Sequence, residues 1–249
     1  MISFVTCIKL MPGYTDFADR LRLYVDSIAE HCTVPYEILI VEDRCARNVA
    51  LLDTVVPPAW LAQRRARILP YVAAYPNPHG YNMIEAYAKN VGILAARYPF
   101  ICVTNCDIVF GSCFFEFAPS LTPGVFYRFL QYETDAVHSS VDAVLAAPAT
   151  CINPTLADPT QWTLNTIAYK SGDIMLMDSD SWRRIRGYPE NDVWVHSDLI
   201  VCTVARNAGL KLMVPPSVRI YTSPQDRAHT TRGFELAKAY EYLDRLTCN

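Results

Sequence analysis

Hydrophobic and polar positions alternate between two periods along the first half of the chain. Runs rich in Ile, Val and Leu stand at residues 2–10, 36–43 and 100–110. Such nearly continuous apolar runs are typical of strands buried on both faces of a sheet. Between them, apolar residues recur at helical spacing within residues 12–32 and 81–97. The pattern therefore predicts strands and helices in alternation.

Two weaker elements belong to the same series. Residues 59–67 predict a short helix, and RILPYVAA at residues 67–74 predicts a strand that Pro70 interrupts. Strands that alternate with helices need crossover connections, and these give a parallel sheet with helices on its faces. We therefore expect a single α/β domain with a mixed, mostly parallel sheet.

The second half of the chain has a less regular pattern. Residues 120–162 are rich in Pro, Ala and Thr with weak periodicity, which favours loops, including a mobile one near residues 146–161. We expect regular elements again in a strand and short helix at 172–190, a helix at 196–209 followed by a strand, and a final helix at 231–246.

The composition is that of an ordinary globular enzyme, with 249 residues, 51% of them hydrophobic and 19% charged. The chain is too apolar for disorder, and its net charge of −3 gives no reason to expect nucleic acid as a partner. No apolar run reaches the roughly 18 residues of a membrane helix, so we expect no membrane span. The first residues also lack the features of a signal peptide.

Nine cysteines are scattered along the chain, and none of them forms a CxxC pair. Several lie inside apolar runs, where a thiol behaves as a small hydrophobic group. We therefore expect free, mostly buried thiols rather than disulfides or a zinc site. Free thiols are typical of a reducing compartment, which favours a cytoplasmic protein.

Polar side chains follow three of the predicted strands. These strand ends are Thr6 to Lys9, Glu42 with Asp43, and Asn105 with Asp107. The carboxyl ends of parallel strands meet at one edge of the sheet, where ligands gather. Converging carboxylates there would form a pocket with a negative centre, suited to a divalent cation or to ribose hydroxyls. The same residues also fit ordinary turns, and spacing alone leaves both interpretations open.

Residues 86–110, AYAKNVGILAARYPFICVTNCDIVF, carry a longer pattern. Its two parts are Ala88, Lys89, Asn90 and Gly92 on the predicted helix, and Asn105-Cys106-Asp107 after the predicted strand. The segment resembles the core of the family-two glycosyltransferases with the GT-A fold. Their pattern is Ala-Arg-Asn-x-Gly, a strand and then Asp-x-Asp. YEILIVEDR at residues 36–44 resembles the second strand of that family, whose terminal acid would be Asp43 or, alternatively, Glu42.

The resemblance continues in order through most of residues 1–220. SGDIMLMDSDSWRRIRGYPEN at residues 171–191 resembles the Gly-Asp…Trp…Arg-Gly-Tyr-Pro-Glu stretch of some bacterial and viral members. VHSDLIVCTVARNAGLK at residues 195–211 resembles the acid-led helix that follows it. This order implies a nucleotide-sugar-binding half at residues 1–110 and an acceptor-binding, catalytic half at residues 111–249.

The resemblance implies Asp198 as catalytic base and Asp107 as a metal ligand. His229 is a further candidate ligand, with a solvated loop position as the alternative. The expected donor nucleotide contacts are Thr6, Lys9, Glu42, Asp43, Asn90, Asn105, Cys106 and Asp107. The expected acceptor contacts are Gly172, Asp173, Trp194 and His196. Lys9 could also be an exposed surface lysine, and Trp194 could equally belong to the core.

The activity implied is transfer of a hexose or pentose from a UDP- or GDP-sugar to a glycan or glycoprotein acceptor. A Mn²⁺ or Mg²⁺ ion would stabilise the leaving diphosphate, and one carboxylate base would give inversion. Asn105 departs from the pattern because it is neutral, and it would weaken metal binding or contact ribose instead. The alternatives are an inactive binding module of the same fold and a sugar nucleotidyltransferase, which would want a glycine-rich loop that this chain lacks.

Overall fold

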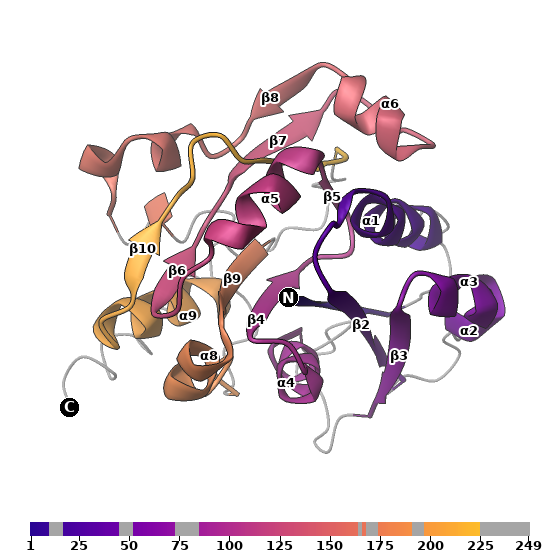
Figure 1. Cartoon of the computed structure of the whole chain (residues 1–249), viewed down its shortest axis with the longest axis horizontal. Helices are drawn as coiled ribbons and strands as arrows, with labels where there is room; N and C mark the ends of the chain where they lie inside the picture. Colours follow the sequence, from indigo (N-terminus) through magenta and orange to yellow (C-terminus); the bar gives the residue numbers. More distant parts are fainter. Residues whose placement is uncertain are drawn as a thin grey trace, which may run out of the picture.

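The computed structural model describes residues 1–9, 17–44, 52–72, 85–163, 166–167, 174–190 and 197–224. Its main sheet has seven strands (Figure 1). In spatial order they are β10 (Lys211–Met213), β6 (Val125–Tyr127), β9 (Ile174–Asp178), β4 (Phe100–Thr104), β1 (Ile2–Ile8), β2 (Tyr36–Asp43) and β3 (Ala66–Tyr71). Strand β9 runs antiparallel to both of its neighbours, and the other pairings are parallel. The prediction of a mixed, mostly parallel sheet is confirmed.

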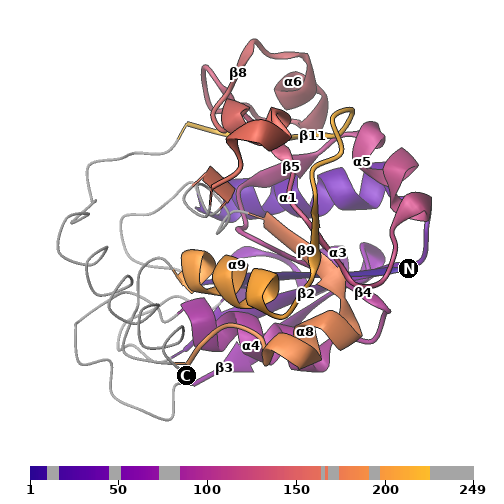
Figure 2. The same cartoon turned by 90° about the vertical axis from the view of Figure 1, so that its left-hand side faces the viewer.

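Helices cover both faces of this sheet. Helices α4 (Glu85–Ala95) and α8 (Ser179–Ile185) lie on one face, and α1 (Phe17–His31) and α5 (Ser112–Phe117) lie on the other (Figures 1 and 2). Helix α9 (Ser197–Asn207) packs against α8, and the short α2 (Leu52–Val55) and α3 (Pro58–Gln63) lie near β3. The sheet strands β1 and β2 are buried along their whole length, which explains their apolar sequences.

A second, smaller sheet lies beyond α5. Its order is β5 (Ile108–Phe110), β11 (Arg219–Thr222), β7 (Leu130–Thr134) and β8 (Ala149–Cys151). The apolar run at residues 100–110 therefore forms two strands in two different sheets, not one strand. The chain passes from one sheet to the other at residues 105–107. Thr104 is the last residue paired in the main sheet, and Ile108 pairs with Thr222 in the second.

The prediction that residues 120–162 consist mainly of loops was wrong, and mobility near residues 146–161 stays a prediction. Besides β6, β7 and β8, this region contains η1 (Ala118–Ser120), α6 (Val141–Ala146), η2 (Pro154–Ala157) and η3 (Pro159–Gln161). The buried Asn153 fixes part of it, since its amide bonds the backbone of Gln131 and Phe129 at 2.8 and 3.0 Å. These elements are too short for a sequence period to develop. The helix expected at residues 231–246 lies outside the described residues.

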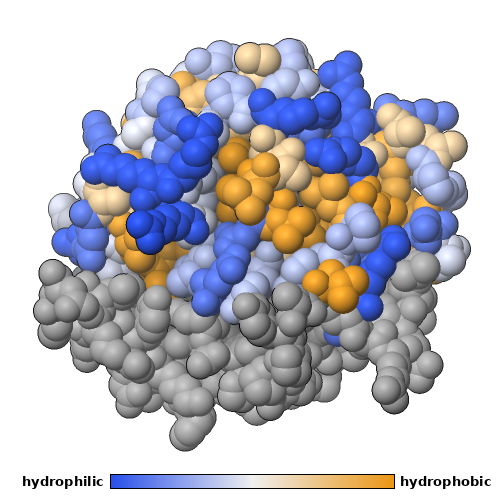
Figure 3. Space-filling model, turned by 90° about the horizontal axis from the view of Figure 1, so that it is seen from below, coloured by the Kyte–Doolittle hydropathy of each residue, from blue (hydrophilic) through white to orange (hydrophobic). Residues whose placement is uncertain are grey.

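The cysteines of the described residues are free thiols, as the sequence predicted, and most are buried. The surface seen from below shows hydrophobic residues gathered between hydrophilic ones (Figure 3). Few large hydrophobic side chains of the described residues are strongly exposed, and Leu94 on α4, at 84%, is the most exposed of them. None of the described helices has the length and apolar character needed to cross a membrane.

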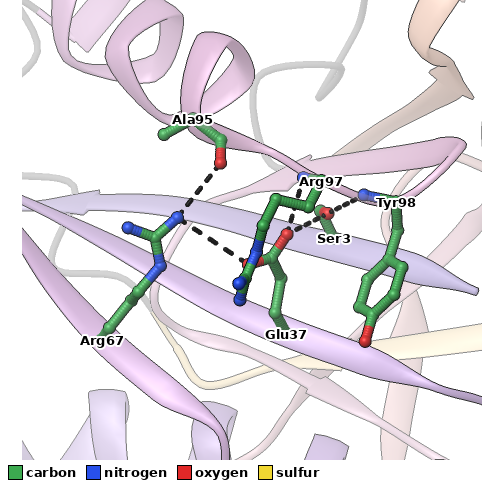
Figure 4. Close-up of polar contacts among 6 residues, drawn as sticks. All are labelled: Ser3, Glu37, Arg67, Ala95, Arg97 and Tyr98. Carbon is green, nitrogen blue, oxygen red and sulfur yellow. Dashed lines mark hydrogen bonds and ion pairs between the residues drawn. The ribbon is translucent and has the colours of Figure 1, made fainter.

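The amino ends of the strands are closed by a polar cluster (Figure 4). Glu37 at the start of β2 accepts a hydrogen bond from Oγ of Ser3 at 2.7 Å. It also accepts bonds from the backbone N of Arg97 at 2.7 Å and from the guanidinium of Arg97 at 3.0 and 3.1 Å. Arg67 donates to the last turn of α4 at Ala95. This cluster ties three strands and a helix together, so it stabilises the fold at the edge opposite the predicted site.

Candidate functional site

The carboxyl ends of β1, β2 and β4 meet at one edge of the main sheet. The register pairs Ile8 with Glu42 and Thr6 with Thr104, so the residues that follow these strands lie close together. Strand β9 runs the other way and begins at Ile174, opposite Thr104. The sheet therefore brings the predicted polar strand ends to a single edge, as a parallel arrangement requires.

Lys9 and Asp43 form an ion pair at this edge. Nζ of Lys9 lies 3.5 Å from Oδ2 of Asp43, and both side chains are largely buried. The alternative of an exposed surface lysine was therefore wrong. In this pair the ammonium of Lys9 donates hydrogen bonds and the carboxylate of Asp43 accepts them. A nucleoside has groups of both kinds, on its ribose and on its base.

Glu42 and Thr6 are enclosed in the protein rather than presented at the edge. The fully buried Glu42 accepts bonds from Arg44 at 2.6 and 2.8 Å and from the backbone N of Leu52. Thr6 is also fully buried, two residues before the end of β1, and its hydroxyl has no hydrogen-bond partner in the described part of the chain. Of the two acids proposed for the second strand, Asp43 is the better placed to contact a nucleotide. We do not retain Glu42 and Thr6 as nucleotide contacts.

The loop Asn105-Cys106-Asp107 joins the two sheets, between the end of β4 and the start of β5. Cys106 packs in the core cluster that contains Ile108 and Phe110. Burial, reinforced by the charge of Asp107, raises the pKa of the Cys106 thiol well above its ordinary value. The thiol is therefore neither a nucleophile nor a ligand contact, and its place in the donor set is corrected to a packing role. Asn105 and Asp107 are partly exposed.

Asp107 contacts two residues that the sequence did not single out. Oγ1 of Thr222, at the end of β11, donates to Oδ2 of Asp107 at 3.3 Å, and Nη1 of Arg20 lies 3.9 Å from the same oxygen. Arg20 also donates to the backbone oxygen of Pro224 at 3.2 Å. Helix α1 and strand β11 both flank β5, which is why they reach the loop that precedes it.

Lys89 is the buried cation beneath this loop, with 1% of its surface exposed. Its Nζ donates to Glu85 at 3.1 Å and to Oδ1 of Asn105 at 3.3 Å, and lies 5.4 Å from the ring centre of Tyr188. Burial by itself would lower the pKa of Lys89, but attraction to Glu85 and Tyr188 outweighs it and raises the pKa above its ordinary value. Lys89 is therefore protonated at neutral pH and holds Asn105 in place.

Asn90 holds the segment after α8 instead of facing the nucleotide. Its Nδ2 donates to the backbone oxygen of Tyr188 and to Glu190, both at 2.8 Å, and its Oδ1 accepts from the backbone N of Tyr188 at 2.7 Å. Gly187 makes this possible, because it has a φ of 72° and a Cβ there would lie 2.4 Å from Oδ1 of Asn90. We therefore correct Asn90 from a donor contact to a positioning residue.

Asp198 stands in the first turn of α9, next to the buried Leu199 and Ile200. Burial raises the pKa of the Tyr188 hydroxyl. The positive charge of Lys89 opposes this shift, and the negative charge of Asp198 adds to it. Asp198 therefore lies within electrostatic range of Tyr188. Tyr188 in turn stacks on Trp182 at 5.6 Å, and both rings are buried, so both aromatics pack in the core. Tyr188 therefore packs between Trp182 and Lys89, whose ammonium lies 5.4 Å from the centre of its ring.

Five predicted site residues lie outside the described residues. They are Gly172, Asp173, Trp194 and His196 on the acceptor side and His229 as a metal ligand. Arg20 and Thr222 were missed because helical spacing marks the buried face of α1 without saying which distant loop it meets.

The sequence matches no protein-family profile and no characterised protein. The structure does resemble solved structures. TarS of S. aureus in complex with UDP-GlcNAc superposes with a TM-score of 0.60 at 11% identity, over 94% of this chain and 61% of the TarS fragment. GalNAc-T7 with UDP, GalNAc and Mn²⁺ superposes with a TM-score of 0.65 at 11% identity, over 96% of this chain and 47% of that one.

The chain has the GT-A fold. The same arrangement is found in TarS bound to UDP, at a TM-score of 0.58 and 10% identity over 90% of this chain. This chain spans 60% to 61% of the length of the TarS fragments and less than half of the length of GalNAc-T7. Since identity is this low, the likeness establishes the fold and leaves the activity to the site.

Proposed function

We propose that this GT-A protein is a glycosyltransferase that moves a hexose or pentose from a UDP- or GDP-sugar to an acceptor hydroxyl. The observation that carries the proposal is the carboxyl edge of the sheet. There Asp43 ends β2, and Asn105 and Asp107 lie in the loop after β4. Each of the three contacts a cation from another element. An edge with both acidic and basic groups suits a ligand that has hydroxyls at one end and a diphosphate at the other.

The two parts of the edge would divide the donor between them. Asp43 with Lys9 would bind the nucleoside, because a carboxylate accepts hydrogen bonds from ribose hydroxyls and base N–H groups. Asn105 and Asp107, with the cations beside them, would face the diphosphate. Asp173, Gly172, Trp194 and His196 stay predictions for the acceptor side, which would take a glycan or a glycoprotein.

Asp198 is the proposed base. An acceptor hydroxyl is a poor nucleophile until a carboxylate within hydrogen-bond reach takes its proton. In a direct displacement the acceptor oxygen forms a bond to the anomeric carbon while the bond to the diphosphate breaks, so the configuration inverts. The position of Asp198 in the first turn of α9 favours its negative charge, because backbone N–H groups point toward that end of a helix.

The residues described here fit a divalent cation poorly. Among them no group of three or more His, Cys, Asp and Glu side chains could hold a metal ion. Asp107 faces Arg20, and Oδ1 of Asn105 faces Lys89, so the two oxygen ligands of the motif each lie beside a positive charge. His229 lies outside the described residues and stays a prediction. We therefore derive no step through a metal, although GalNAc-T7 binds Mn²⁺ in this fold.

Asn105 also favours one alternative, an inactive binding module that keeps the fold. The substitution Asp198→Asn separates the two functions. UDP-sugar and GDP-sugar panels with arrayed glycan acceptors would first identify a productive pair, with release of the nucleoside diphosphate as the readout. We expect turnover of the variant to fall on the order of 10²–10⁴-fold, while nucleotide binding, measured by thermal shift, stays unchanged.

Asp180→Asn is the matched control, because Asp180 also occupies the first turn of a helix but has a strongly exposed side chain that pairs with the exposed Arg183. It should leave turnover unchanged. Full turnover in Asp198→Asn would show that another group takes the proton. Nucleotide binding without transfer to any acceptor would favour the binding module.

A further inference from the structure

Both polar residues of the loop Asn105-Cys106-Asp107 contact a positively charged side chain. Asp107 contacts Arg20 of α1, and Asn105 contacts Lys89 of α4. These helices lie on opposite faces of the sheet, so the two cations approach the loop from opposite sides (Figure 1). The loop thus has positive charge on either side of its single carboxylate.

The contact with Lys89 also decides what Asn105 presents to a ligand. An ammonium group can only donate hydrogen bonds, so the atom that faces Lys89 must be the amide oxygen of Asn105. The amide nitrogen therefore points away from Lys89. An N–H group binds a phosphate oxygen and repels a metal ion, so this orientation changes the chemistry that Asn105 can offer.

Arg20 lies beside the carboxylate of the loop and carries a group suited to phosphate. Its Nη1 lies 3.9 Å from Asp107, longer than the 2.7–2.9 Å of a tight guanidinium–carboxylate bond. The same carboxylate oxygen accepts the shorter bond from Thr222 at 3.3 Å. A guanidinium carries its N–H donors in a planar fork that matches two phosphate oxygens. Its side chain is 14% exposed, so it lies near the surface of the edge.

We propose that Arg20 binds the diphosphate of the donor and stabilises it as a leaving group, while Lys89 orients Asn105 as a second donor. The transfer would then proceed without a divalent cation. This inference rests on the proposed function. In the step itself, the bond from the anomeric carbon to the phosphate oxygen breaks, and its electron pair stays on that oxygen beside Arg20. The acceptor oxygen takes its place on the anomeric carbon and gives its proton to Asp198.

The test uses the full chain and compares UDP with uridine, which lacks the diphosphate, by calorimetry in EDTA and again in MnCl₂. GDP and guanosine form a parallel series. We expect the diphosphate to bind equally well in both buffers. Arg20→Gln should weaken UDP binding about tenfold or more, equivalent to roughly 1.4 kcal/mol. The same substitution should leave uridine binding unchanged, because only the diphosphate would contact Arg20.

Arg22→Gln is the matched control, because Arg22 lies on the same helix but contacts Asp19 and the backbone of Val55 at the surface. It should bind UDP like the unaltered chain. Thermal unfolding of each variant without nucleotide checks that the fold is kept.

The substitution Asp107→Asn should change UDP binding in opposite directions, depending on whether Arg20 or a metal ion binds the diphosphate. If Arg20 binds the diphosphate, removing its carboxylate partner leaves UDP binding in EDTA as tight as before or tighter. If a metal held by Asp107 binds it, the same variant loses UDP binding. UDP binding that requires MnCl₂, is lost in Asp107→Asn and is unchanged in Arg20→Gln would overturn the inference and leave the glycosyltransferase proposal intact. A chain that binds neither UDP nor GDP in either buffer would overturn the proposed function itself.

Discussion

The two ends of the main sheet hold their carboxylates in different ways. At the amino edge, Glu37 accepts hydrogen bonds of 2.7 to 3.1 Å from Ser3 and Arg97 (Figure 4). At the carboxyl edge, Asp43 and Asp107 lie 3.5 and 3.9 Å from their cations. Backbone and side-chain donors close the first site, whereas longer contacts between separate elements form the second.

The amino edge stabilises the fold, and the carboxyl edge is the one that we propose as the ligand site. Burial by itself would raise the pKa of Glu37, but the hydrogen bonds from Arg97 and Ser3 outweigh it and hold the pKa below its ordinary value. The charged form is thus strongly favoured by the fold. Helix α4 contributes to both edges, through Lys89 near its start and Ala95 at its end.

The largest effect on stability should follow from Glu37→Ala. The substitution leaves the backbone N of Arg97 and the buried hydroxyl of Ser3 without their acceptor. We expect the free energy of unfolding to fall by about 3 kcal/mol, measured by urea denaturation. Glu30→Ala, at an exposed position of α1, should stay within about 0.5 kcal/mol of the unaltered chain. UDP binding by the folded fraction should not change.

The pH dependence of the stability of Glu37→Ala tests whether the charge of Glu37 causes the loss. Because the folded pKa of Glu37 is lowered, its stabilisation is fully present above the ordinary value of 4.5 and is lost as the pH falls through the folded value. The stability difference between the unaltered chain and Glu37→Ala should therefore shrink below pH 4.5. A constant difference down to pH 3 would show that packing, not charge, accounts for the loss.

The helix that joins the two edges gives the second test. Gly92 of α4 packs so closely on the sheet that a Cβ there would lie 2.2 Å from Val5 and 3.2 Å from Val41. Gly92→Ala should cost about 2 kcal/mol, because overpacking outweighs the gain in helix propensity. It should also weaken UDP binding, since Lys89 lies one turn away on the same helix.

Gly111→Ala is the control for this substitution. A Cβ at Gly111 would meet only ordinary contacts, the nearest at 3.5 Å from Leu145. Its stability should change by less than about 1 kcal/mol. If Gly92→Ala were equally mild, α4 would not couple the two edges.

The smallest effect should come from Thr222→Val, the carboxyl-edge counterpart of Glu37→Ala. It removes the hydrogen bond to Asp107 at 3.3 Å and keeps the shape of the side chain. We expect a loss of about 1 kcal/mol in the free energy of unfolding. Thr150→Val, at an exposed position of β8, should be neutral. A loss as large as that of Glu37→Ala would remove the contrast between the two edges.

Much of the fold could be predicted because its strands and helices carry strong local signals. The apolar runs of β1, β2 and β4 and the spacing in α1 and α4 predict elements that the structure has, and alternation alone predicts a parallel sheet. Residues 120–162 defeated this approach, since strands of three to five residues show no period. Their pairing depends on contacts such as those of Asn153, which no local pattern encodes.

By itself the sequence determined the elements and the polar residues at the strand ends, because both follow from local spacing and from the geometry of a parallel sheet. Only the tertiary structure decided what those residues do. It enclosed Glu42, gave Asn90 to the segment after α8, and brought Arg20 and Thr222 to Asp107. The reason is physical: burial and pairing depend on which distant elements pack together, and a short period along the chain carries no information about that.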